Sequence, residues 1–201
     1  MKATGEQLFA LAVYLLARFN AVVREKGDAI EMRAVATVFG VMNLFGVNVP
    51  TDEAFLRRFW TTLGPVVYAP EGHGQYDTHV RVLAHEVTHV VQFWRDGVSF
   101  LVRYCTSRGR AELEAEAERA AIEVWWLLTG TLPPSIDALA ITRHGYALDD
   151  SHAQLATDLL ETAVVSVSQG VISTDVGLET LTWLKLYAPT AIVGRVSAVR
   201  S

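Results

Sequence analysis

The chain has 201 residues, of which 51% are hydrophobic and 19% are charged. This composition is too apolar and too weakly charged for a disordered chain, and the length suits one compact domain. The net charge of −5 and the scattered positions of the 17 Lys and Arg residues argue against a nucleic-acid partner. The single cysteine, Cys105, excludes an internal disulfide and a multi-cysteine zinc site.

An unbroken run of ten apolar residues, 8–17, lies near the start of the sequence. It is shorter than the roughly 18–20 residues that cross a bilayer, so we expect no transmembrane span. Glu6 precedes the run and no small-residue cleavage site follows it, which favours a buried or interfacial helix over a signal peptide. The compartment stays open, with the cytoplasm slightly favoured.

Apolar periodicity and helix-breaking residues predict a mostly α fold with a small β element, an α+β class. The predicted helices cover residues 4–24, 32–45, 51–63, 78–95, 110–128, 151–167 and 178–187. Val-Val-Tyr-Ala, between two prolines, is the predicted strand at 66–69. We expect a single domain over 1–201, with 1–50 as a helical N-terminal extension and 130–201 as a helical C-terminal part.

The motif His85-Glu86-Val87-Thr88-His89 has the pattern HExxH and falls inside the helix predicted at 78–95. Residues four apart on a helix project from the same face, so the two imidazoles can reach one zinc ion. Glu86 projects beside them, where a carboxylate can take a proton from a water molecule at the metal. Val82 and Phe93 lie on the histidine face, which therefore is expected to be covered or to line a cleft.

Two histidines leave zinc one protein ligand short, and the best source is the acidic helix predicted at 110–128. Its glutamates form two pairs with i, i+4 spacing on nearly opposite faces, Glu112 with Glu116 and Glu114 with Glu118. Either pair could place one carboxylate on the metal and the second against a ligand histidine. The spacing alone leaves both pairs open.

HExxH followed by a Glu in an E-x-x-A-[DE] setting resembles the gluzincin metallopeptidases, especially their minimal single-domain members. The stretch His-Glu-Val-Thr-His-Val-Val-Gln, residues 85–92, is similar to HE-[LIV]-x-HVxQ in small bacterial and phage-associated peptidase-like proteins. The resemblance covers residues 66–124 and implies a zincin-like pair of active-site helices with a short edge strand at 66–69 that binds an extended peptide. Matched to that pattern, Glu112 would be the third zinc ligand and Glu116 would support a ligand histidine, although the family more often has Asp there. An alignment shifted by two residues selects Glu114 and Glu118 instead.

The resemblance implies zinc-dependent hydrolysis of a peptide bond, with one Zn²⁺ per chain and Glu86 as the base. A donor to the developing oxyanion is also expected. His144 and Tyr146 are candidates for it, as are Tyr104 and Arg103 between the two helices.

The remaining histidines are expected to lie outside the metal site. His73 falls in a glycine-rich loop, and His79 projects about 120° from His85 on the same helix. His152 follows two aspartates at a predicted helix start, where capping explains it.

The expected partner is a peptide or protein substrate, and the apolar helices could also form a homo-oligomer or a larger assembly. The alternative function is that of a non-catalytic binding or structural protein that keeps a zincin fold. The presence of Glu86 argues against it, because a scaffold needs the ligands but not the base. A protease held latent by a partner or by its N-terminal segment also stays open. A deformylase is not favoured, since the chain lacks the glycine- and cysteine-bearing motif of that class.

Overall fold

The computed structural model describes residues 3–44, 53, 56–57, 59–70, 79–134 and 148–199. Its helices are α1 (Gly5–Arg18), α2 (Ile30–Leu44), α4 (Val80–Asp96), α5 (Val98–Tyr104), α6 (Ser107–Thr129), α8 (Asp150–Ser168) and α9 (Asp175–Tyr187), with short 3-10 turns η1 (Lys26–Asp28) and η3 (Pro189–Ala191). Its strands are β1 (Val22–Glu25), β2 (Thr61–Leu63), β3 (Val66–Ala69), β4 (Val171–Ile172) and β5 (Ala198–Val199). The predicted class, mostly α with a small β element, is confirmed.

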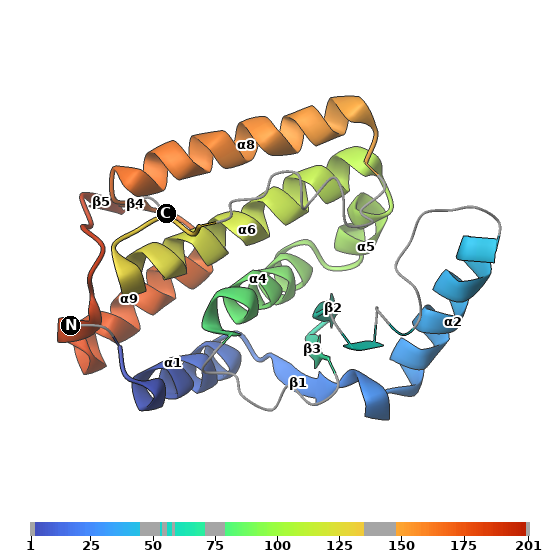
Figure 1. Cartoon of the computed structure of the whole chain (residues 1–201), viewed down its shortest axis with the longest axis horizontal. Coiled ribbons are helices and arrows are strands. Elements are labelled where there is room, and N and C mark those ends of the chain that lie inside the picture. Colours follow the sequence, from blue (N-terminus) through green and yellow to red (C-terminus); the bar gives the residue numbers. More distant parts are fainter. Residues whose placement is uncertain are drawn as a thin grey trace.

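Helix α6 is the centre of the fold, with α4 packed on one side and α8 on the other (Figure 1). The side chain of Thr106 caps its first turn, and Gly130 ends it in the left-handed conformation. Small side chains let neighbouring helices approach closely, and α6 is buried around most of its circumference. Its fully buried alanines are Ala111, Ala117, Ala120 and Ala121.

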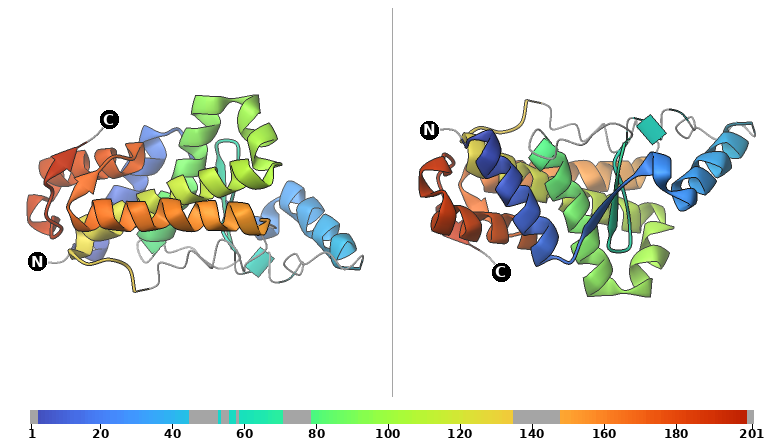
Figure 2. Two further views of the ribbon diagram at one scale, coloured as in Figure 1. Left: turned by 90° about the horizontal axis from the view of Figure 1, so that it is seen from above. Right: turned by 90° about the horizontal axis from the view of Figure 1, so that it is seen from below.

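The main core fills the space between α1, α4, α6 and α9 (Figures 1 and 2). Leu11 and Leu15 of α1 are completely buried there, together with Leu83 and Val87 of α4. Helix α1 is therefore part of the main core. None of the described helices is both long enough and apolar enough to span a membrane.

A three-stranded sheet in the order β1-β3-β2 lies beside α4, and α2 packs on it through Met32, Ala36 and Tyr68 (Figure 2). The predicted strand at 66–69 is confirmed as β3, but its expected place at the sheet edge is wrong. β3 pairs in parallel with β1 and antiparallel with β2, so it is the middle strand. Within the described residues, β2 pairs only with β3 and forms the edge nearest α4.

Two predicted helices extend into segments that are strands. Residues 22–25, placed at the end of the first helix, form β1, because α1 stops at Arg18 and Asn20 turns the chain with a φ of 52°. Residues 61–63, placed at the end of the third helix, form β2, which turns through Gly64 into β3.

Candidate metal centre

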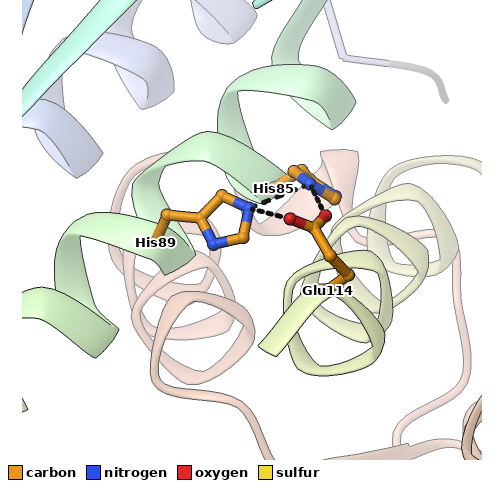
Figure 3. A group of neighbouring side chains, drawn as sticks. All are labelled: His85, His89 and Glu114. Atoms are coloured by element: carbon orange, nitrogen blue, oxygen red, sulfur yellow. Dashed lines mark hydrogen bonds and ion pairs between the residues drawn. The ribbon is translucent and has the colours of Figure 1, made fainter. Parts of the chain in front are cut away.

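The two histidines of the HExxH motif project from α4 toward α6, as the four-residue spacing predicts (Figure 3). Their Nε2 atoms lie 3.2 Å apart. His89 and Glu86 are buried, and 15% of the His85 side chain is exposed. The expectation that this face of the helix is covered is confirmed, and His85 marks the side on which solvent reaches it.

Glu114 of α6 completes the cluster (Figure 3). Its Oε2 lies 3.2 Å from His85 Nε2, and its Oε1 lies 3.4 Å from His89 Nε2. The side chain is 1% exposed, and Oε2 accepts no hydrogen bond of normal geometry within the described chain. A buried carboxylate oxygen with an unused lone pair beside two imidazoles is suited to a metal ion.

His85, His89 and Glu114 therefore form a group that could hold a metal ion, with one ligand atom of each residue within 4.8 Å of the others. Two imidazoles and one carboxylate are a common donor set for catalytic zinc, which keeps further coordination positions open. The residues present fit the metal that the sequence motif implies.

The predicted third ligand, Glu112, lies outside this cluster. It accepts hydrogen bonds from Arg108 and Arg103 at 2.9 and 3.3 Å and faces away from the histidines. The physical reason is the rotation of α6 about its axis, which turns Glu114 and Glu118 toward α4. The structure thus brings together the pair that the shifted alignment selects, and the placement of Glu112 as ligand is corrected.

The two histidines are oriented through their second ring nitrogens. His89 Nδ1 lies 2.9 Å from Gln92 Oε1, and His85 Nδ1 lies 3.4 Å from Glu118 Oε2. Such partners fix each ring so that its Nε2 faces Glu114. Arg81 in turn pairs with Glu118.

Glu116, the predicted partner of a histidine, contacts neither imidazole. It pairs with Arg95 at 2.7 Å and accepts a hydrogen bond from Gln92 Nε2 at 3.1 Å. Its link to His89 therefore runs through Gln92, while Glu118 contacts His85 directly. The contact of Gln92 with His89 could have been predicted from the sequence, because Gln92 follows His89 by three residues and so lies on the same helix face.

Charges and hydrogen bonds within the cluster shift the pKa of both histidines and of Glu114. Burial lowers the pKa of His85, but hydrogen bonds and charges from Glu114 and Glu118 outweigh it and raise the pKa well above its ordinary value. The pKa of His89 is also raised, because the Glu114 charge outweighs burial. Burial raises the pKa of Glu114, yet the two imidazoles hold it well below its usual range.

Glu86 is held beside the cluster by the edge strand β2. The Thr62 hydroxyl contacts Glu86 Oε2 at 2.7 Å and the Glu86 carbonyl oxygen at 3.1 Å. The Glu86 charge helps to raise the pKa of both histidines. The role of Thr62 had no signal in the sequence, since it follows from the sheet topology.

Tyr104 is the candidate oxyanion donor that the structure brings to the cluster. Its hydroxyl donates to Glu114 Oε1 at 2.6 Å, and its ring meets that of His89 edge to face. Gly109 allows this approach of α5 to α6, since a Cβ there would collide with the Arg103 carbonyl. Arg103 itself pairs with Asp96 and Glu112, outside the cluster.

The other candidates fall elsewhere. His144, Tyr146 and His73 lie outside the described residues. His79 is at the N-terminus of α4, with its ring 6.2 Å from that of Trp60. His152 is in the first turn of α8, where it pairs with the capping residue Asp149 as expected.

Comparisons of the chain with models of known protein families, with curated proteins and with solved structures found no match.

Proposed function

We propose that the protein is a zinc-dependent peptidase that hydrolyses peptide bonds with Glu86 as the general base. The observation that carries the proposal is the convergence of His85, His89 and Glu114, whose ligand atoms lie within 4.8 Å of one another, on a helix that also bears Glu86. A site that only held a structural metal would use four protein ligands and would need no base beside them. The described cluster offers three ligands and a buried carboxylate neighbour.

His85 Nε2, His89 Nε2 and a Glu114 carboxylate oxygen would hold the zinc ion. When bound, zinc supplies a Lewis acid that polarises the scissile carbonyl and makes a water molecule acidic enough to attack near pH 7. The two histidines keep the orientation that Gln92 and Glu118 give them.

Glu86 accepts a proton from the attacking water while the water oxygen bonds to the carbonyl carbon. It then delivers that proton to the amine as the carbon–nitrogen bond breaks. Thr62 supports this role, because its hydroxyl engages Glu86 Oε2 and leaves Oε1 to be the oxygen that meets the water. Tyr104 can turn its hydroxyl from Glu114 to the carbonyl oxygen as negative charge develops there.

An extended peptide is the substrate class that the neighbourhood favours. β2 is an edge strand in the described sheet and contacts α4 beside Glu86. Backbone groups on such an edge can pair with a peptide chain whatever its side chains are.

The proposal is tested by incubating the zinc-loaded protein with a mixture of unstructured peptides and detecting fragments by mass spectrometry. We expect the wild-type protein to cleave peptides. In Glu86→Gln, kcat should fall at least about a hundredfold, while the variant should bind as much zinc as the wild type. Glu161→Gln, an exposed position on α8, is the matched control. Zinc-loaded wild-type protein that cleaves none of the peptides, or a Glu86→Gln variant as active as wild type, would contradict the proposal.

A further inference from the structure

Lys26 is a fully buried lysine next to the candidate site. It lies in η1, between β1 and α2, and its side chain is 0% exposed. Burying an amine is costly, and burial lowers the pKa of Lys26 to about 7, against an opposing attraction from the Glu86 charge. A methionine of similar length would fill the same space without that cost. The presence of an amine here therefore calls for a reason other than packing.

Lys26 is connected to Glu86 through the edge strand β2. Its Nζ donates to Thr61 Oγ1 at 2.7 Å, so the amine joins η1 to the edge strand β2. The next residue of β2, Thr62, is the one whose hydroxyl engages the Glu86 carboxylate at 2.7 Å. Neighbouring residues of a strand point to opposite faces, so fixing Thr61 on one face fixes the direction of Thr62 on the other.

We propose that Lys26 is a positioning residue for Glu86, which it serves by anchoring β2 so that Thr62 holds the Glu86 carboxylate toward the metal position. This inference rests on the proposed function, because it assigns Lys26 to the same site. The Nζ donates to Thr61 whether or not it carries a charge, so the anchoring does not depend on its protonation. The anchoring acts on Glu86 through β2 and Thr62, so removal of Lys26 should leave the metal in place.

Acetohydroxamic acid is a probe of Glu86 that does not depend on turnover. Its two oxygens chelate zinc, and the hydrogen that it retains needs an acceptor such as a carboxylate beside the metal. Its Kd for the zinc-loaded protein, measured by calorimetry, reports whether Glu86 is in position. The Kd of the Glu86→Gln variant for acetohydroxamic acid gives the affinity expected when that acceptor is lost.

The test compares Lys26→Met and Thr61→Val with wild type, with Lys185→Met on the exposed face of α9 as the matched control. We expect both β2-anchoring variants to weaken acetohydroxamate binding roughly tenfold, in the direction of Glu86→Gln. Zinc stoichiometry and zinc Kd should stay at the wild-type value in both variants. Tm at pH 7 should not fall in Lys26→Met, whereas Thr61→Val should lower it, because the buried Lys26 amine then loses its acceptor. On a peptide that the wild type cleaves, kcat should fall while KM is kept. Lys185→Met should change none of these quantities.

Three results would overturn the inference, and they are distinguishable. Wild-type affinity for acetohydroxamate in Lys26→Met shows that the amine does not position Glu86. A parallel fall of zinc affinity, probe affinity and Tm in Lys26→Met shows a merely structural role. A wild-type protein that takes up no zinc removes the proposed function together with this inference.

Discussion

Glu123 of α6 is a buried carboxylate whose removal should destabilise the protein strongly. Its side chain is 0% exposed, and it caps the entry to α9 from within the core. One oxygen accepts from the backbone N–H of Ser173 at 3.0 Å, and the other accepts from that of Thr174 at 3.0 Å and from its hydroxyl at 2.6 Å. Arg119, one turn earlier, pairs with the same carboxylate at 3.0 Å.

The magnitude follows from these contacts. Glu123→Ala leaves two backbone donors and a partly buried arginine without their acceptor, which is expected to cost about 4 kcal/mol of the free energy of unfolding. Glu123→Gln keeps the shape, but either orientation of the amide places an NH₂ group against a backbone donor, so it should cost about 3 kcal/mol. For a chain of this length, 4 kcal/mol corresponds to a fall in Tm of about 10 °C.

Urea unfolding at constant pH measures both variants, with the m-value as a check that the unfolding transition is unchanged. Glu161→Gln on the exposed side of α8 is the control and should stay within about 0.5 kcal/mol of wild type. A loss below about 1 kcal/mol in Glu123→Gln would refute the reasoning, because the carboxylate would then not be needed by its donors.

Three further predictions concern the metal centre. Gln92→Ala should weaken zinc binding by roughly 10–100-fold, because His89 loses the partner that orients its ring. Gln154→Ala on α8 is the control and should leave zinc affinity unchanged. Competition with a chromogenic chelator measures the zinc affinity of both variants. Zinc affinity should fall as pH is lowered from 8 to 6, because the pKa of His85 and of His89 is raised in the metal-free protein and protons then compete for the ligand nitrogens. Calorimetry that finds the same Kd at both pH values would contradict this sign. Removal of zinc with a chelator should lower Tm. Zinc added back at a hundred times its Kd should raise the free energy of unfolding by about 2.7 kcal/mol, which a thermal shift titration measures.

The helices were the part of the fold that the sequence predicted best, because their caps and apolar faces are local. α4 ends at Gly97 and α6 at Gly130, where the glycines stand. The strands β1 and β2 were mistaken for helix ends. β2 is joined to β3 by the turn at Gly64 and Pro65, and the helix predicted over 51–63 ran across it up to that turn. β1 pairs with β3, which lies far along the chain. Pairing over that distance leaves no local pattern in the sequence.

The difference between local and long-range patterns also explains which residues of the candidate site could be predicted. The spacing of His85 and His89 lies within one helix turn and fixes their common face. The third ligand depends on how α6 is rotated against α4, and its sequence gave no single polar face because alanines surround both glutamate pairs. Glu112 and Glu114 were therefore equally compatible with the spacing, and only the packing of the two helices separates them.

The central claim is a zinc site made by His85, His89 and Glu114. The most direct measurement is the zinc content and zinc Kd of the purified wild-type protein beside Glu114→Gln and Glu112→Gln, two matched substitutions on one helix. The account predicts one zinc per chain in wild type and in Glu112→Gln, and an affinity at least about a hundredfold weaker in Glu114→Gln. A wild-type protein that binds no zinc when supplied with it, or a loss of affinity in Glu112→Gln but not in Glu114→Gln, would contradict the account.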